Sequence, residues 1–466
     1  MKVLFASRYV DPIDPRANRN IVNQARVLQD EFGIDLEILT WPTNDLWSGP
    51  LPDQVPTLAP LKVQRENLNY SVILGPASWD EVAGGKVISS HAWDAAVNYG
   101  INLLATQKPD IFHLHHRFGF WWLLESAQRL GIPTIYSNYD WGMVCLRTVL
   151  VNGANNLCDG VVNPDKCAAC IKTGRIRLVG RLNEALAETW VGQKILSLLE
   201  HSAVTGEKFS ALGGVSKPAL QRTIIHQKRV KKVIQGLGHC VTPSEFGKRF
   251  YQQFGIADQK VSVLPWAHNT VSVEPPRSLS AEPFTITFIG RVSQDKGVHL
   301  IFEALERLSD IPPVLLRVAG ADESEYSTQL QGKYPQFVGI HHVEWQGWSP
   351  IDALLRTTDV TIIPSTLMDN TPLTLIESMA YRVPVIATNI PSINTLLTNG
   401  VGYLAEYNSV ESLSCEIKAA VLDQEKIRLR KTVFPKILTK HEYAAELCRI
   451  YASLLRKNSA NDPHEF

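Results

Sequence analysis

The sequence predicts an α/β protein built from two doubly wound, Rossmann-like domains that face each other across an interdomain cleft. The chain has 466 residues, which is too long for a single hydrophobic core. Both halves alternate short apolar segments with amphipathic ones, the pattern of strands and helices in a parallel sheet. Between the halves, residues 272–283 are rich in proline and polar side chains, as expected of a linker.

The elements of each half follow from this alternation. In the first half we expect strands at residues 2–7, 35–40, 110–114, 133–137, 239–243 and 261–265, and helices at 17–30, 119–130 and 244–254. Residues 41–85 are rich in Pro, Trp and polar side chains without periodicity, which predicts an irregular insertion. In the second half we expect strands at 284–289, 314–319, 360–363 and 383–387. The predicted domains are 1–271 and 272–440, and residues 441–466 form a last helix and a tail.

Composition and charge narrow the class of protein. Hydrophobic residues make up 45% of the chain and charged residues 20%, with 46 basic and 46 acidic side chains and a formal net charge of +0. This balance argues against a nucleic-acid-binding surface that spans the whole protein. No apolar run approaches the roughly 18–20 residues that span a bilayer, so we expect a cytoplasmic protein. Basic and apolar residues alternate over 217–235, which suggests peripheral contact with the inner face of a membrane. A solvated helix face over a core stripe is the alternative.

Two carboxylates, Asp369 and Glu377, bracket a turn that leads into a predicted helix. Pro372 suits the first helical position, because a proline lacks the N–H that would be unpaired there. Asn370 or Thr371 is then a natural N-cap. The free amides of such a helix start bind phosphate, and carboxylates accept hydrogen bonds from hydroxyl groups. The stretch therefore predicts a site for a phosphorylated, hydroxyl-rich ligand.

A second motif follows the predicted strand at 284–289. Arg291 and Lys296 stand between Gly290 and Gly297, where two cations at a strand end could neutralise a diphosphate. The alternative is that both side chains are solvated charges of an ordinary loop. The stretch at 369–377 favours a diphosphate site, because it predicts a second anion-binding element.

Together, these runs resemble the retaining glycosyltransferases of family 4, which belong to the glycosyl transferases group 1 and have the GT-B fold. The matching segments are residues 288–297, 364–380 and 383–387. The resemblance implies metal-independent transfer of a hexose from a nucleoside diphosphate sugar, with UDP-glucose favoured, to a sugar or lipid-linked sugar in polysaccharide biosynthesis. It implies retention of the anomeric configuration, and a last helix that packs back on the first domain.

The resemblance also implies roles for single residues. Arg291 and Lys296 would bind the donor diphosphate and stabilise the leaving group, and Glu377 would hold the ribose hydroxyls. Asp369 stands where the family usually has Glu and would contact the donor sugar, with an arm one methylene shorter. The turn at Gly290 and the stretch that leads into the helix would line the donor through Asn370, Thr371, Pro372 and Leu373.

Histidines cluster at the end of the predicted strand at 110–114. Such a cluster could bind a metal, and buried or exposed structural histidines are the alternative. The family pattern Asp-x-x-His-x-His places His115 near the donor sugar and the acceptor, so we expect it to be the catalytic residue of this half. His113 lies two residues earlier on the same strand face and would support it. Arg8 and Asp140 are further candidates for the acceptor side.

Four of the seven cysteines fall in one short stretch, 145–170. In a reducing compartment, such spacing favours a metal over disulfides. Four thiolates with one Cys-x-x-Cys pair suit a structural zinc ion, and free thiols are the alternative. The candidate ligands are Cys145, Cys158, Cys167 and Cys170.

Two other functions stay open. One is a non-catalytic subunit that binds a nucleotide sugar, and the other is a phosphorylase or epimerase with the same fold. The first strand–helix turn lacks the paired glycines usual in the family, which keeps the non-catalytic subunit in play. Arg291, Lys296 and Glu377 argue against it.

Overall fold

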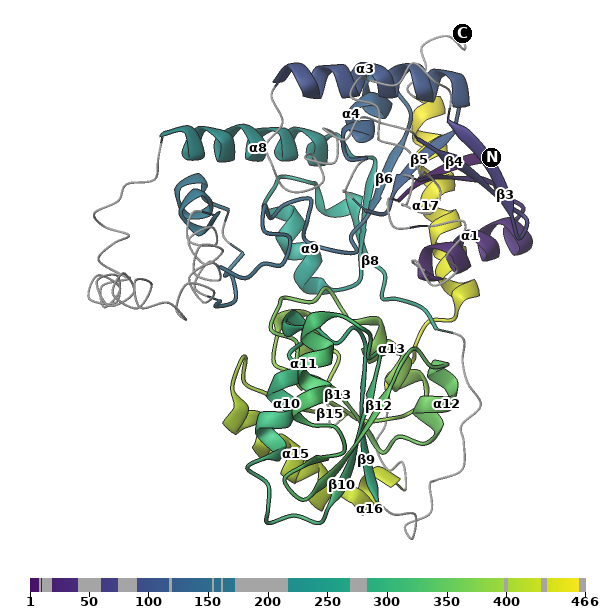
Figure 1. Cartoon of the computed structure of the whole chain (residues 1–466). Coiled ribbons are helices and arrows are strands. Elements are labelled where there is room, and N and C mark those ends of the chain that lie inside the picture. Colours follow the sequence, from purple (N-terminus) through teal and green to yellow (C-terminus); the bar gives the residue numbers. More distant parts are fainter. Residues whose placement is uncertain are drawn as a thin grey trace.

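The computed structural model describes most of the chain as two sheet domains, one above the other (Figure 1). The described residues are 1–7, 10, 19–40, 60–73, 90–116, 120–152, 155–160, 162–171, 217–268, 283–397, 401–428 and 434–460. Arg8 lies outside them.

The N-terminal domain is built on a sheet of eight strands among the described residues, in the order β3-β4-β2-β1-β5-β6-β7-β8. All neighbours pair in parallel except β3 and β4. The central strands β1, β5 and β6 are mostly apolar and are buried except at Lys2, as expected of a parallel sheet with both faces covered. The strands are β1 (Lys2–Ala6), β2 (Asp35–Thr40), β3 (Leu61–Arg65), β4 (Leu68–Val72), β5 (Ile111–Leu114), β6 (Thr134–Ser137), β7 (His239–Thr242) and β8 (Val261–Val263).

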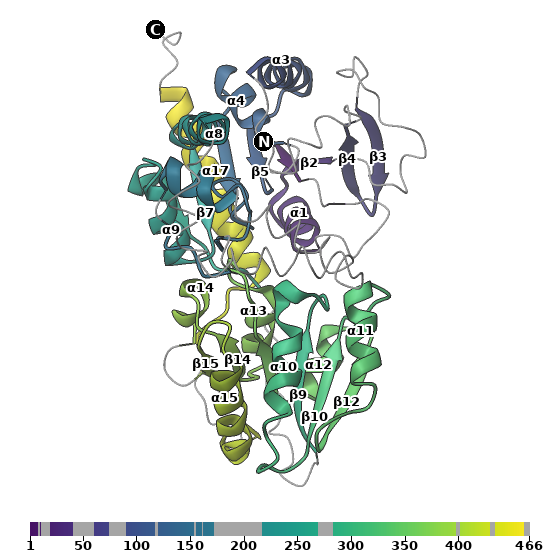
Figure 2. The same cartoon turned by 60° about the vertical axis from the view of Figure 1, so that its left-hand side comes forward.

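Helices cover this sheet, and one of them comes from the far end of the chain. Helices α3 and α4 pack against each other, and α17 packs against α1 (Figure 2). On α17, the Tyr451 hydroxyl lies 2.8 Å from Nδ1 of His113 on β5, so the C-terminus is joined to the first domain's core. The helices are α1 (Arg19–Phe32), α3 (Ser90–Gln107), α4 (Trp122–Arg129), α8 (Lys217–Gln235), α9 (Glu245–Gln252) and α17 (Lys440–Ala460).

The expectation of an irregular segment at 41–85 is wrong in part. Strands β3 and β4 form a hairpin inside it, and β4 adds to β2 at the edge of the sheet. Glu66 and Asn67 both have positive φ, 47° and 65°, which a tight two-residue hairpin turn requires. The turn could not be predicted from the sequence, because this segment lacks the glycine that is typical of a two-residue hairpin turn.

The C-terminal domain has a seven-stranded sheet among the described residues, in the order β11-β12-β10-β9-β13-β14-β15. Only β11 and β12 pair antiparallel. The strands are β9 (Phe284–Ile289), β10 (Val314–Ala319), β11 (Phe337–Val338), β12 (His341–Gln346), β13 (Val360–Ile363), β14 (Val385–Thr388) and β15 (Gly402–Ala405). The helices are α10 (Val298–Leu305), α11 (Glu325–Lys333), α12 (Ile351–Arg356), α13 (Leu373–Ala380), α14 (Pro391–Asn394), α15 (Val410–Leu422) and α16 (Gln424–Arg428).

The strand order places a switch point in each sheet. In the second sheet, the chain runs outward from β9 through β10 and then returns to β13 on the other side of β9. In the first sheet, β1 stands in the same way between β2 and β5. Ligands of doubly wound sheets bind at the carboxyl ends of strands beside such points. The loops after β9, β13 and β5 are therefore the places where a ligand site is expected.

A buried ion pair fixes the end of α16 to this sheet. Arg428 and Asp359 are each 1% exposed, and Nε of Arg428 lies 3.3 Å from Oδ1 of Asp359. Oδ2 of the same carboxylate also accepts from the backbone N–H of Thr285 at 2.8 Å. The guanidinium lies over the ring of Phe284.

We predict that Arg428→Met lowers the free energy of unfolding by about 3–5 kcal/mol, because it leaves Asp359 buried without its cation. Chemical denaturation measures the loss. Lys418→Met is the matched control, since it breaks an exposed ion pair with Asp310 in the same domain and should change stability little. If both variants lower the free energy of unfolding equally, burial of the ion pair does not determine the loss of stability.

Candidate functional site

The loops that follow β9 and β13 are joined to each other at the switch point. The backbone N–H of Thr366 donates to the carbonyl of Asp295 at 3.0 Å, and its hydroxyl donates to the carbonyl of Gln294 at 3.1 Å. Further on, the Thr374 hydroxyl donates to the carbonyl of Ile289 at 3.2 Å. These bonds hold the segment around Lys296 against the segment around Asp369.

Gly297 allows the two loops to come this close. Its φ is +70°, and a Cβ built on it would lie 1.9 Å from the carbonyl oxygen of Pro364. Gly297 ends the short 3-10 turn Gln294–Lys296 and precedes α10. Any other residue would force the Lys296 turn away from the loop after β13.

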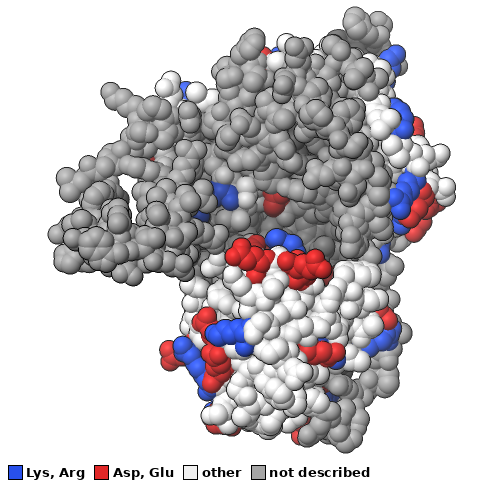
Figure 3. Space-filling view, in the orientation of Figure 1, with Lys and Arg blue, Asp and Glu red and all other residues white. Residues whose placement is uncertain are grey.

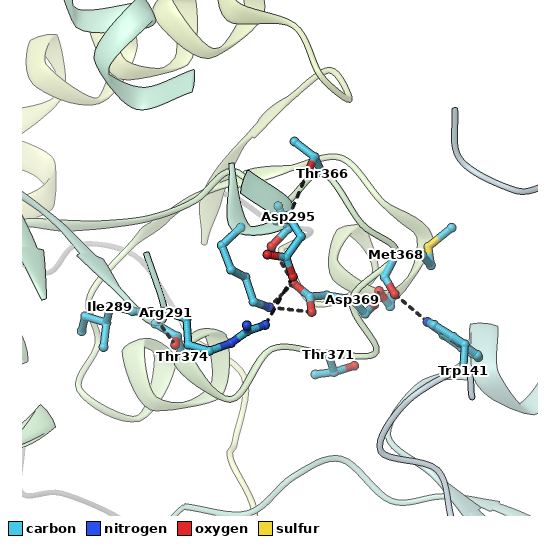
Figure 4. A network of polar contacts seen from close by, with 12 residues as sticks. Trp141, Ile289, Arg291, Asp295, Thr366, Met368, Asp369, Thr371 and Thr374 are labelled. Atoms are coloured by element: carbon cyan, nitrogen blue, oxygen red, sulfur yellow. Dashed lines mark hydrogen bonds and ion pairs between the residues drawn. The ribbon is translucent and has the colours of Figure 1, made fainter. Parts of the chain in front are cut away.

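Lys296 and Asp369 form the centre of the site. Nζ of Lys296 lies 2.9 Å and 3.0 Å from the two carboxylate oxygens of Asp369. The Ser365 hydroxyl donates to the same carboxylate at 2.5 Å. Arg291 is held more loosely, with its side chain 73% exposed and 3.3 Å from Oδ2 of Asp295 (Figure 4). Two cations therefore stand on one loop, each beside a carboxylate.

Charges of both signs are interspersed on the described face of this domain, which carries no broad field of one sign (Figure 3). If the site binds an anion, its attraction would come from local groups such as Lys296 and Arg291 rather than from the charge of a whole face.

Helix α13 begins one residue later than the sequence suggested. Pro372 is the N-cap rather than the first helical residue, and among the described residues no side-chain hydrogen bond caps the helix. Thr371 does not act as the N-cap, because its φ of 61° places it in the left-handed region. This conformation is strained for a β-branched residue. The start of α13, including the 42% exposed Leu373, therefore lies without a capping side chain beside Asp369.

Glu377, on the last turn of α13, differs in environment from Asp369. It is partly buried, and this burial raises its pKa from 4.5 to about 7. The positive charge of Lys440, at the start of α17, opposes this rise. The carboxylate can therefore change its protonation state near neutral pH.

The histidines on and directly after β5 lie in the core of the N-terminal domain. His113 is fully buried between Tyr451 and the Ser137 hydroxyl, which lies 2.8 Å from its Nε2. Burial lowers the pKa of His113 to about 3. The ring of His115 stacks on that of His113 with 4.1 Å between centroids, and its pKa is held well below the usual range, mainly by burial. His115 is therefore a neutral, completely buried imidazole.

Two aromatic rings connect His115 to the loop after β13. Tyr139 lies 5.6 Å from His115, centroid to centroid, and stacks on Trp266 at 4.4 Å. The Trp266 indole N–H donates to the carbonyl of Thr371 at 3.1 Å. A chain of contacts therefore runs from His115 in the N-terminal domain to the carbonyl of Thr371 in the C-terminal domain.

Several polar atoms at this junction are buried and have no hydrogen-bond partner among the residues that the structure describes. Each atom belongs to a residue that is less than a tenth exposed. A buried polar atom that forms no hydrogen bond lowers the stability of the fold. Such atoms indicate where a hydroxyl-rich ligand would be recognised. They are both ring nitrogens of His115, Nδ2 of Asn138, Oδ1 of Asn370 and Oγ1 of Thr371.

Asp140 follows β6 on the acceptor side. Its Oδ1 accepts from the backbone N–H of Gly142 at 2.6 Å, which stabilises a turn. Its charge also raises the pKa of His116, although burial lowers that pKa more strongly. The structure therefore places Asp140 beside the histidine cluster.

The expected zinc site does not form. Among the described residues, which include all four cysteines of the cluster, no group of three or more His, Cys, Asp or Glu side chains could hold a metal ion. The segment is ordered by other bonds: the N–H of Cys158 donates to the carbonyl of Leu150, and Val151 pairs with Leu157. Burial and the neighbouring thiols of the cluster raise the pKa of Cys167 to about 11.

Sequence reasoning missed Asn138 and Trp266, which contact the loop after β13. Each follows closely on a strand, β6 and β8 respectively. Position after a parallel strand was the signal that could have identified them, since these ends converge at one edge of the sheet.

Comparisons with known proteins agree with this geometry. Residues 274–432 match the family model described as glycosyl transferases group 1. The lipopolysaccharide 1,2-N-acetylglucosaminetransferase of Salmonella typhimurium is 25% identical over 366 residues, which cover 69% of this chain and 89% of that protein.

Two solved structures are similar along the whole chain. Sucrose-phosphate synthase from Thermosynechococcus elongatus has a TM-score of 0.63 at 14% identity, covering 98% of this chain and 99% of the other. HepE from Anabaena in complex with UDP-glucose has a TM-score of 0.56 at 13% identity, covering 99% and 100%. These similarities confirm the predicted pair of Rossmann-like domains.

We predict that Gly297→Ala lowers the free energy of unfolding by about 1–3 kcal/mol, through left-handed strain and collision with the Pro364 carbonyl. The control is Gly332→Ala on α11, where a Cβ would meet nothing within 4 Å. That change should stabilise the helix by about 0.5–1 kcal/mol. Thermal unfolding of both variants measures the difference, and a stabilising Gly297→Ala would contradict the close approach.

Proposed function

We propose that the chain is a group 1 glycosyltransferase that transfers a hexose from a nucleoside diphosphate sugar to an acceptor hydroxyl. The match of residues 274–432 to the family model and the likeness of the fold to solved glycosyltransferase structures support this proposal. The observation that carries this proposal is the pairing of two loops at the switch point. One brings Arg291 and Lys296, and the other brings Asp369 and the uncapped start of α13. Glu377 stands about one helical turn further on.

The roles of these groups follow from their charge and position. Arg291, Lys296 and the N-terminus of α13 stabilise the charge that develops on the diphosphate as it leaves. Their two positive charges act where a divalent cation acts in other transferases, so the proposed transfer is metal-independent. Glu377 accepts hydrogen bonds from the ribose hydroxyls, and Asp369 accepts them from the donor sugar.

His115 contributes from the other domain. It is neutral, so it orients a sugar or acceptor hydroxyl by hydrogen bonding rather than by charge. In the proposed reaction the acceptor attacks from the face that the diphosphate leaves, which retains the anomeric configuration, as in family 4.

The donor and acceptor classes are supported by the relatives. UDP-glucose is the proposed donor, and the Anabaena neighbour was solved with that molecule. The Salmonella relative is named as a lipopolysaccharide transferase, and another relative, 26% identical over 178 residues, as a putative colanic acid biosynthesis glycosyltransferase of Escherichia coli. The proposed acceptor is therefore a saccharide or lipid-linked saccharide of a polysaccharide pathway.

A lipid-linked acceptor would bring the protein to a membrane surface. No described helix is long and apolar enough to cross a bilayer. Helix α8 presents exposed Lys228, Lys231 and Lys232 opposite a buried face, and Lys232 also pairs with Glu125. We place the proposed peripheral contact with anionic lipids on this helix face.

The first experiment identifies the donor and tests Lys296. Nucleotides are screened by thermal shift, and nucleotide sugars that stabilise the protein are then assayed for nucleotide release and for a glycosylated product. Lys296→Ala should weaken nucleotide binding about 10- to 100-fold, because a charge-assisted contact is lost. It should lower turnover about 100- to 1000-fold, because the leaving group loses stabilisation.

Lys418→Ala is the control, since it removes another ion-paired lysine of the same domain. Binding without turnover in the unaltered protein would favour a non-catalytic subunit, and a sugar phosphate or an epimerised nucleotide sugar would favour the phosphorylase or epimerase. Full turnover by Lys296→Ala would remove Lys296 from the diphosphate site.

The pKa of Glu377 predicts a pH dependence of donor binding. Because the ionised form is the better hydrogen-bond acceptor and the pKa is about 7, affinity for UDP-glucose should fall as pH decreases below about 7. The fall should approach tenfold per pH unit well below the pKa. Calorimetric titrations with UDP-glucose, at several values between about pH 5 and about pH 8, compare the affinity of the unaltered protein with that of Glu377→Gln. The variant should bind more weakly at high pH and lose the dependence; identical profiles would contradict the assignment.

A further inference from the structure

The residues on both sides of Asp369 are fastened to the N-terminal domain. The indole N–H of Trp141 donates to the carbonyl of Met368 at 2.6 Å, and the N–H of Met368 donates to the carbonyl of Val149 at 3.1 Å. On the other side, the amide of Asn370 donates to the carbonyl of Asn138 at 2.6 Å. The carboxylate of Asp369 therefore stands on a loop that the opposite domain holds at two points.

Trp141 is itself rigidly placed. Its side chain is 1% exposed and packs edge-on against Phe246 and Phe250, with 5.4 Å between centroids in each case. Figure 4 shows its indole reaching across to Met368, directly next to Asp369 in the chain. A buried ring with two aromatic neighbours cannot change its direction without repacking. Its N–H therefore fixes the Met368 peptide in space.

We propose that Trp141 is a positioning residue that sets how far the Asp369 carboxylate reaches toward the donor sugar. The inference rests on the proposed function. If Trp141 has this role, the N-terminal domain contributes to the specificity for the donor sugar. Neither Trp141 nor its bond to Met368 follows from the motifs of the donor domain.

The expected consequence is a loss of selectivity as well as of rate. A displacement of about 1 Å in a positioning group costs on the order of 100-fold in rate. Asp369 is also held by Lys296 and Ser365, so the loss should be smaller, about tenfold. Sugar epimers differ in the direction of one hydroxyl, so a shifted carboxylate discriminates between them less well.

The experiment compares Trp141→Phe with two controls. Trp141→Phe keeps an aromatic ring against Phe246 and Phe250 and removes only the N–H donor. Trp345→Phe removes an equivalent bond, since that indole donates to the carbonyl of Tyr334 at 2.7 Å within the C-terminal domain. Phe246→Leu disturbs the packing of Trp141 and keeps its N–H.

Three quantities are measured for each protein: the affinity for UDP, the kcat and KM for UDP release from UDP-glucose and UDP-galactose, and the hydrogen exchange of the Met368 amide. In Trp141→Phe we expect unchanged UDP affinity, kcat for the better donor reduced about tenfold, a smaller ratio between the two epimers, and faster exchange at Met368. Trp345→Phe should keep the ratio and the slow exchange. Phe246→Leu, which loosens the packing of Trp141 but keeps its N–H, should change both less than Trp141→Phe does.

The proposal is overturned if Trp141→Phe slows both donors by one factor and weakens UDP equally, because that is a structural effect. It is also overturned if the variant behaves as the unaltered protein does. If the unaltered protein releases UDP from neither donor and other nucleotide sugars fail too, the proposed function fails. Hydrogen exchange then decides alone. Faster exchange at Met368 in Trp141→Phe but not in Trp345→Phe supports placement of the loop by Trp141, and unchanged exchange in Trp141→Phe refutes it.

Discussion

The site depends on the contact between the loops that follow β9 and β13. These strands are neighbours in the sheet although they are far apart in the chain, so their carboxyl ends meet at the switch point. Gly297 lets the first loop approach the Pro364 carbonyl, and Thr366 ties the second loop back to it. The salt bridge between Lys296 and Asp369 can form only because this backbone contact exists.

The same contact joins the two domains. The loop after β13 receives hydrogen bonds from Trp141, Trp266 and, through Asn370, from the segment after β6. Helix α17 adds a second connection, since Tyr451 on it binds His113 and Lys440 at its start acts on the pKa of Glu377. Motion of one domain relative to the other would therefore move groups at both ends of the proposed donor site.

The sequence predicted the backbone of this arrangement well and its side-chain contacts poorly. The strands leading to Arg291, Asp369 and His115 were found because continuous apolar runs mark buried parallel strands.

The β3–β4 hairpin was missed because Glu66 and Asn67 adopt positive φ without a glycine. Likewise, the left-handed conformation of Thr371 shifted the start of α13 by one residue. Among the described residues no group could hold a zinc ion, although Cys167 has the other three thiols as neighbours, because spacing in the chain does not determine the geometry that a metal needs. Contacts such as that of Trp266 with Thr371 depend on how two domains meet, which no local pattern encodes.

The charges of the site suggest how the proposed diphosphate would bind. Lys296 is partnered by Asp369, and Arg291 lies near Asp295, so each cation has a carboxylate beside it. An arriving diphosphate would exchange these carboxylates for phosphate oxygens, and two bare cations would never face each other. The exchange would leave Asp369 free of Lys296 at the moment the sugar arrives beside it. A carboxylate released in this way can accept hydrogen bonds from sugar hydroxyls, which couples binding of the diphosphate to recognition of the hexose.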